Sequence, residues 1–370
     1  MTEKTPSQII GARVKHYRTR LDLSQTDLAR AIGVNSAQII SQIESGVREL
    51  TARELARAAK ALTTSVANLL TDSEPDLPTA RWRDRPQKNF KEVEARLCLR
   101  CERFALLEEW CGERTYRPLP VVSLQKGLLP RIGEILRVAQ EIRNAMELGG
   151  RPASSLKDVL EEGYGIRIFH DSFDGTALCV SGQFGKAILL NRDNVRSRRN
   201  FSLAHELFHL LVEGIYPGGA GEDEERHAQV FASALLLPSE SISAALGGKA
   251  KDGKIHVREL VAAAQEFHVS TEAMLWRLCN LGNMSKETVK SILANENLKS
   301  FEIRGLRITD APDDLPERFT RLAYTAYDRG RLGLNKLAEF LEVKVEQLHF
   351  NSEDWTSDVA LDEEAEVTFA

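Results

Sequence analysis

Residues 202–212 read Ser-Leu-Ala-His-Glu-Leu-Phe-His-Leu-Leu-Val, an apolar stretch that contains the pattern HExxH. Because an α-helix brings positions i and i+4 onto one face, His205 and His209 can bind one metal ion from adjacent turns. Glu206, beside the first histidine, would then point at a water molecule bound to that ion. Two histidines and a glutamate are otherwise unusual on a stripe of leucines, so the stretch predicts a zinc hydrolase helix.

A turn and a second helix follow this predicted metal helix. Gly214 and the run Pro-Gly-Gly at 217–219 cannot continue a helix and must reverse the chain. Residues 222–236 then carry apolar side chains at helical spacing behind an acidic start. Catalytic zinc takes three protein ligands and keeps one position open, so we expect Glu225, on the packed face of the returning helix, to be the third. Its rivals in the same cluster are Asp223, Glu224 and His227. For any carboxylate there, the alternative is a solvated helix N-terminus, where negative charge is favoured.

The wider run 199–209, Arg-Asn-Phe-Ser-Leu-Ala-His-Glu-Leu-Phe-His, followed by Glu225-x-x-Ala-Gln-x-Phe-Ala-x-x-Leu-Leu-x-Pro238, resembles the ImmA/IrrE metallopeptidases over about residues 132–250. In that family the glutamate three residues before the alanine is the third zinc ligand, which implies this role for Glu225 and Zn²⁺ as the cofactor. The resemblance also implies an endopeptidase that cleaves a repressor or antitoxin-like protein in a stress, mobile-element or phage-defence circuit. Phe208 and Gln229 replace the usual glycine and asparagine, and neither position is a ligand.

Three short β-rich runs precede the metal helix, at 165–169, 176–181 and 186–191. Turn residues separate them, which predicts a small antiparallel sheet. The run Lys186–Asn191 is expected to be either an edge strand, which would accept an extended substrate by strand addition, or an ordinary core strand.

The predicted chemistry assigns one residue a clear role and leaves another role open. With zinc bound, Glu206 would act as the general base and pass the proton to the leaving amine. An oxyanion would also need stabilising. The candidates are Tyr164, Arg198 and Arg199, and for each of them a structural role is the alternative.

The N-terminal seventy residues predict five short helices, at 9–20, 25–32, 37–44, 52–62 and 65–70. Ser24 is a good N-cap for the second helix, with Asp27 at the capping-box position. The words Leu-Ser-Gln-Thr-Asp-Leu-Ala-Arg-Ala-Ile-Gly-Val (23–34) and Ile-Ser-Gln-Ile-Glu-Ser-Gly (40–46) resemble the Xre/Cro-type helix-turn-helix domain. That resemblance implies a double-stranded DNA operator as partner and a homodimer reading two half-sites.

The stretch between the two words is one residue longer than is usual in that family, so the start of the recognition helix is uncertain from sequence. We expect base-edge contacts from Asn35, Ser36, Ala37, Gln38 and Gln42, and phosphate contacts from Gln25 and Arg48. Residues 1–70 hold ten Lys or Arg against six Asp or Glu, a balance that permits DNA binding without requiring it. A five-helix protein-interaction module is the alternative.

Composition limits the class of protein. With 370 residues, of which 42% are hydrophobic and 28% charged, the chain can form two or three globular domains. No run approaches the roughly 20 apolar residues of a membrane span, and the start has no signal-peptide pattern, so we expect a cytoplasmic protein. Five cysteines, an odd number, favour reduced thiols. Cys98, Cys101 and Cys111 could suggest a metal site, but they fall on one predicted helix and lack a fourth ligand.

These patterns together predict a multidomain, mainly α protein. We expect a helix-turn-helix domain over 1–72, a linker and long helix over 73–131, an α+β zincin-like metallopeptidase domain over 132–250, and a helical region with an acidic tail over 251–370. Near the C-terminus, helices at 315–328 and 334–341 predict an ordinary hairpin or a degenerate second helix-turn-helix.

Two hypotheses about function follow. The first is a DNA-binding regulator fused to a zinc endopeptidase. The second is a non-proteolytic transcription factor whose peptidase-like domain is a sensor or dimerisation module. Glu206 favours the first, because a structural metal site would not need it.

Overall fold

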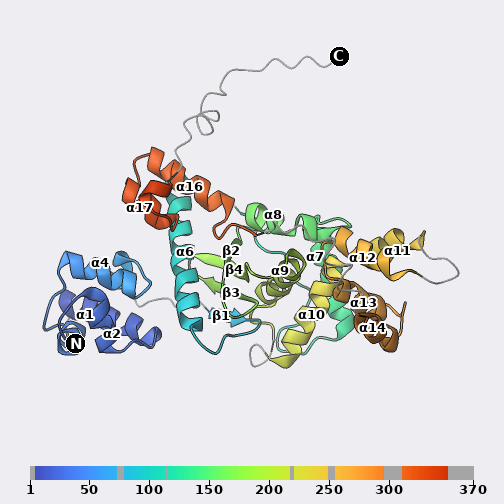
Figure 1. The fold of residues 1–370 in the computed structure, drawn as a ribbon, viewed down its shortest axis with the longest axis horizontal. Coiled ribbons are helices and arrows are strands. Elements are labelled where there is room, and N and C mark those ends of the chain that lie inside the picture. The colour runs from blue at the N-terminus through green and yellow to red at the C-terminus, as the bar shows by residue number, and fades with distance from the viewer. Residues whose placement is uncertain are drawn as a thin grey trace, which may run out of the picture.

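The computed structural model describes residues 5–72, 79–113, 116–216, 221–248, 255–295 and 311–348. Figure 1 shows a small sheet at the centre, with the N-terminal helices on one side of a long helix and the sheet on its other side. The mainly helical fold class predicted from the sequence, with a small sheet in its second domain, is confirmed. The acidic tail from residue 351 lies outside the described residues.

The N-terminal domain consists of α1 (Pro6–Arg20), α2 (Gln25–Ile32), α3 (Ala37–Glu44), α4 (Ala52–Ala61) and α5 (Val66–Leu70). Ser24 caps α2 in the predicted capping box with Asp27. Gly33 then ends α2 in the left-handed region, at a φ of 80° that a residue without a Cβ adopts easily. Apolar side chains from these helices, with Leu28, Ile32 and Ile40 fully buried among them, form a core of their own.

The long helix α6 (Phe90–Cys111) lies between this domain and the sheet (Figure 1). On its N-terminal-domain side, Lys91 forms an ion pair with Asp22 at 2.7 Å, and Glu102 accepts a hydrogen bond from Asn68 at 2.8 Å. The helix therefore contacts both neighbours directly.

The sheet has four strands in the order β1-β3-β4-β2. They are β1 (Thr79–Trp82), β2 (Arg167–Asp171), β3 (Ala177–Gly182) and β4 (Gly185–Asn191). β3 pairs antiparallel with both β1 and β4, but β2 pairs parallel with β4, so the sheet is mixed and the prediction of an antiparallel sheet was wrong in this respect. The turn signals predict where the chain reverses but not which strands become neighbours, and here the chain passes from β2 to the far side of β4.

Two expectations about individual segments also change. Lys186–Asn191 belongs to β4, which lies between β3 and β2, so it is a core strand and not an edge. Residues 79–82, expected to lie in a linker, form the edge strand β1. Its alternating pattern is only four residues long, too short to distinguish from the charged linker around it.

The sheet is buried on both faces. On one face Ala177, Cys179 and Ile188 pack against α9 (Arg196–Leu211) and its neighbours, and on the other Leu178 and Leu189 pack toward α6. Around α9 lie α7 (Ile132–Ala145) and α10 (Glu222–Leu236), with α11 (Ser239–Gly247), α12 (Val257–Glu266), α13 (Thr271–Asn280) and α14 (Lys286–Leu293) beyond them. A 3₁₀ turn (Pro152–Ser154), α8 (Leu156–Asp158) and a π turn (Val159–Gly163) precede β2, where the sequence predicts one regular helix over 155–162.

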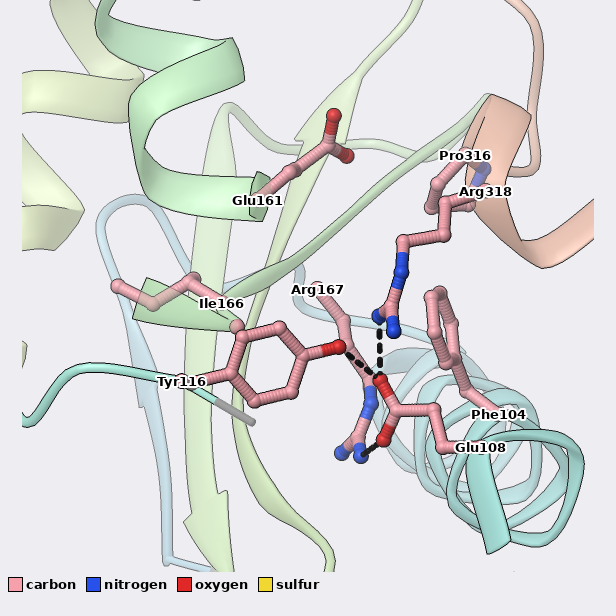
Figure 2. Close-up of a pocket in the computed structure, with 9 residues that line it drawn as sticks. Phe104, Glu108, Tyr116, Glu161, Ile166, Arg167, Pro316 and Arg318 are labelled. Carbon is pink, nitrogen blue, oxygen red and sulfur yellow. Dashed lines mark hydrogen bonds and ion pairs between the residues drawn. The ribbon is translucent and has the colours of Figure 1, made fainter. Parts of the chain in front are cut away.

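The C-terminal helices α16 (Glu317–Asp328) and α17 (Leu334–Phe340), followed by a 3₁₀ turn (Val345–Gln347), pack against α6. A buried carboxylate helps to hold this junction. Glu108 of α6, only 1% exposed, accepts hydrogen bonds from Arg167 of β2, from Arg318 of α16 and from the Tyr116 hydroxyl (Figure 2). Glu108 thus links α6 to β2 and α16, which lie far apart in the sequence.

By length and hydropathy, no single described helix could cross a membrane; only the pair α10 and α11, bent by 48° at their junction, passes that test together.

Candidate metal centre

Three side chains converge between α9 and α10. The Nε2 atoms of His205 and His209 lie 3.2 Å apart. Glu225 places Oε2 3.1 Å from the first nitrogen and Oε1 3.3 Å from the second. A tetrahedral zinc ion with bonds of about 2.0–2.1 Å separates its ligand atoms by roughly 3.3 Å, so the three donors already have the spacing that such an ion requires.

The helices produce this arrangement for simple reasons. The four-residue spacing within α9 stacks the two histidines on one face, and α10 returns with its first turn opposite them. Both imidazoles are at least 98% buried, whereas the side chain of Glu225 is 38% exposed. Solvent therefore approaches the candidate site from the side of the carboxylate.

Of the three rivals of Glu225, Asp223 is exposed and the other two have partners of their own. Glu224, 1% exposed, accepts a hydrogen bond from Nδ1 of His209 at 2.8 Å. Such a carboxylate fixes the orientation and tautomer of a metal-binding histidine. Nδ1 of His227 lies 2.7 Å from the hydroxyl of Tyr216. Of the described His, Cys, Asp and Glu residues, only His205, His209 and Glu225 form a group whose donor atoms lie within 4.8 Å of one another.

Glu206 is buried completely, and neither of its carboxylate oxygens has a well-formed hydrogen bond within the described chain. Burial raises the pKa of Glu206 to about 7, although His209, the Cys179 thiol and Arg83 act in the opposite direction. A completely buried carboxylate with a pKa near neutrality is suited to accepting and returning a proton.

Their surroundings shift the pKa values of the two histidines in opposite directions. Burial lowers the pKa of His205 to about 4, despite its hydrogen bond with Glu225. Burial also lowers the pKa of His209, but hydrogen bonds with Glu224 and Glu225 outweigh it and raise the value to about 9. The two histidines hold the pKa of Glu225 well below its usual range, against the effect of burial. Binding a metal would require His209 to lose its proton.

Two arginines of the β1 segment reach this site, and sequence reasoning missed both. Nη1 of Arg81 lies 2.5 Å from Oε1 of Glu224, the oxygen that also faces His209. Nη1 of Arg83 donates to the Ser202 hydroxyl at 3.0 Å. The only sequence signal for these two arginines is the alternation Arg81-Trp82-Arg83. In a strand, this alternation places both arginines on one face and the tryptophan on the other.

The three oxyanion candidates contact other groups. The Tyr164 hydroxyl donates to the Ala145 carbonyl at 3.4 Å. Arg198 donates to Thr176 at 3.2 Å, and Arg199 donates to the Asn194 carbonyl at 2.5 Å. The contacts of the two arginines support the connection from the sheet into α9, and that of Tyr164 joins the segment before β2 to α7.

In the N-terminal domain, α3 begins at Ala37, which defines the start of the recognition helix that the sequence left uncertain. Most of the predicted base-contacting residues are exposed, namely Asn35, Ser36, Gln38 and Gln42, while Ala37 is half-buried. Gln25 donates to Glu44 at 2.8 Å and Arg48 forms an ion pair with Glu54 at 2.8 Å, so both predicted phosphate contacts have partners within the domain.

The cysteines of α6 are separate buried thiols. None of Cys98, Cys101 and Cys111 forms a disulfide bond. Burial raises the pKa of Cys98 to about 11 and that of Cys101 well above its usual range, which disfavours the thiolate that a metal needs.

Comparison with known families agrees with both parts of this description. Residues 161–278 match the family of the IrrE N-terminal-like domain, a peptidase family, and residues 14–69 match the helix-turn-helix family. The chain therefore carries a helix-turn-helix DNA-binding domain and an IrrE-like metallopeptidase-type domain, and is a regulator with a peptidase-family domain. The predicted fusion of these two families is confirmed. No curated protein matches the chain.

Proposed function

We propose that the chain is a transcriptional regulator whose second domain is a zinc-dependent endopeptidase, with His205, His209 and Glu225 as metal ligands and Glu206 as the catalytic residue. The observation that carries the proposal is the spacing of the three donor atoms, 3.1–3.3 Å, beside the completely buried carboxylate of Glu206. A purely structural metal site would have no use for Glu206.

When bound, Zn²⁺ would polarise the substrate carbonyl and make a bound water a nucleophile near neutral pH. Glu206 would accept the proton of that water and return it to the departing amine. Glu224 would hold the His209 ring through its Nδ1, so that Nε2 stays directed at the ligand position. Glu206 is thus needed for chemistry and not for metal affinity.

The DNA-binding domain would place this enzyme on an operator. The exposed residues of α3, above all Gln38 and Gln42, would contact base edges, because glutamine pairs well with adenine. We further propose a homodimer that reads two half-sites, acting in the cytoplasm. Its protein substrate would be a repressor or antitoxin-like protein of a stress, mobile-element or phage-defence circuit, and cleavage would relieve repression.

The decisive experiment combines metal analysis with a Glu206→Gln variant. Purified full-length chain should hold one zinc ion per protomer, and so should the variant. Only the unmodified chain should cut candidate repressors encoded near its gene. The cleavage products are detected by mass spectrometry. An unmodified chain that is metal-free but still binds DNA would refute the enzyme and support the non-proteolytic regulator.

The DNA-binding part of the proposal is tested on a DNA site that the unmodified chain selects from random sequences. Gln38→Ala should weaken binding to that site by about 1–3 kcal/mol and relax the preference at one base position. Gln229→Ala, an exposed change on α10, is the matched control. Unchanged binding by Gln38→Ala would place the DNA contacts elsewhere, and an equal loss in both variants would show that the effect is not specific to α3.

A further inference from the structure

If β1 is left aside, β3 is the edge strand of the sheet that lies nearest to Glu206, the proposed catalytic carboxylate. Residues 161–278, which match the peptidase family, include β2, β3 and β4 but not β1. Within that part β3 and β2 are the outer strands. The thiol of Cys179 in β3 lies beside Glu206, whereas the amide of His170 in β2 donates to the Asp314 carbonyl at 3.0 Å. The β3 edge is thus the one that an extended peptide would meet at the metal centre.

A segment from outside the matched domain already pairs with this edge. β1 runs antiparallel to β3, with Ala80 opposite Val180 and Trp82 opposite Leu178. The pairing continues past the strand, since the Arg83 amide donates to the Ala177 carbonyl at 3.1 Å. Main-chain pairing of this kind is how a peptide adds itself to a sheet edge.

The side chains of the segment reach the functional residues. Arg81 lies opposite Cys179 and forms its ion pair with Glu224, the carboxylate that holds His209. Burial lowers the pKa of Arg83, while the nearby carboxylates of Glu206, Asp84 and Glu225 raise it. A guanidinium therefore stands within electrostatic reach of both the proposed general base and the proposed third ligand.

The segment is anchored less deeply than the other strands. The side chains of residues 80–83 are all half-buried, whereas the central residues of β3 and β4 are buried. On the face toward α6, the Trp82 indole donates to Glu94 at 2.6 Å and packs edge-on against Phe173. Losing β1 would leave the buried faces of the remaining three strands covered by α6 and α9.

We propose that Thr79–Trp82 occupies the substrate edge of the peptidase domain, and that this stretch of the chain, between its two functional domains, blocks the site until a protein substrate displaces it. The inference rests on the proposed function only in treating the β3 edge as the place where a substrate binds. The class of segment that fits is an extended peptide with basic residues at alternate positions, as in Arg81 and Arg83.

The test measures binding of a fluorescent peptide with the sequence of residues 79–86, Thr-Ala-Arg-Trp-Arg-Asp-Arg-Pro. The full chain is used with one equivalent of Zn²⁺ and with Glu206→Gln throughout, so that nothing is cut. Arg81→Ala/Arg83→Ala weakens the resident strand, and Arg85→Ala/Lys88→Ala, exposed and outside the strand, is the control with the same loss of charge.

A tethered segment competes at an effective concentration of about 1 mM, so the peptide should bind the first variant at least roughly tenfold more tightly than the control or the parent. Equal binding to all three chains, or to none, would overturn the proposal. Replacing residues 79–83 by Gly and Ser, which removes both arginines and strand propensity, should give at least the same gain. Circular dichroism establishes that each variant is folded.

A second check uses the chain with Glu206 intact and Zn²⁺ alone. A cut within residues 79–86, seen by mass spectrometry, would mean that the segment is consumed rather than blocking, and would overturn the proposal. Since the first readout is binding by a chain without Glu206, a negative result there counts against the blocking strand. Failure of the intact chain to cleave any repressor counts against the proposed function instead.

Discussion

Replacing Glu224 and Glu225 separately by glutamine distinguishes a ligand from the residue that supports it. Glu225 places its oxygens 3.1 and 3.3 Å from the two Nε2 atoms, whereas Glu224 meets the His209 ring at Nδ1, on the side away from the candidate ion. Loss of a supporting carboxylate typically weakens metal binding about 10–100-fold, or about 1.4–2.7 kcal/mol. We expect that range for Glu224→Gln and a larger loss, of at least about 100-fold, for Glu225→Gln, which removes one of the three proposed ligands and its charge.

The assay is competition for Zn²⁺ with a chromophoric chelator at pH 7.5, with thermal unfolding of each metal-free variant to show that the fold is kept. Glu222→Gln is the matched control, because it makes the same change in the same first turn of α10 at an exposed position. The reasoning is refuted if Glu224→Gln is the more damaging variant, since that carboxylate would then bind the metal directly. It is refuted equally if the control loses as much affinity as Glu225→Gln.

Three further predictions concern the fold. Glu108→Gln should lower the free energy of unfolding by about 3–5 kcal/mol in a urea titration, because it leaves the buried Arg167 without its counter-charge. A loss below about 1 kcal/mol would contradict this. Burial lowers the pKa of His170 from 6.5 to about 4, so the unfolded state binds a proton more readily than the folded state does. The free energy of unfolding should therefore fall by up to about 3 kcal/mol as the pH drops from 6.5 to 4. His170→Asn should flatten this pH profile, and His256→Asn, at an exposed position, should not. Gly11→Ala would place a Cβ 2.2 Å from the Ile43 carbonyl, so we expect it to destabilise the N-terminal domain by about 1–3 kcal/mol in thermal unfolding, and an unchanged melting temperature would show that α1 can shift away.

The sequence predicts best those features that are periodic over a short range. The bounds of α2 and α3 agree with the prediction at both ends, because capping residues and a turn glycine mark them locally. The HExxH spacing likewise places His205 and His209 on one face of α9. Each of these features depends on neighbours within one or two turns.

The features that the sequence did not reveal depend on long-range pairing. β1 is a four-residue strand in a charged segment, and its partner lies about a hundred residues away, so no local period indicates it. The position of β4 inside the sheet could not be told from its apolar run, which is equally typical of an edge and a central strand. The role of Arg81 at the site follows from this pairing and was missed for the same reason. Glu224 was expected only as a rival ligand, because its place behind the His209 ring depends on how α10 packs against α9.

The position of α6 has a consequence for how the chain can be divided. One flank of this helix contacts the DNA-binding domain, another covers the sheet, and Glu108 joins it to the C-terminal helices. A fragment cut to residues 161–278 would expose Leu178 and Leu189 to water and leave Arg167 without its carboxylate. The smallest piece able to fold with α9 intact is accordingly larger than residues 161–278, which match the peptidase family, and trimming from either end removes part of its support.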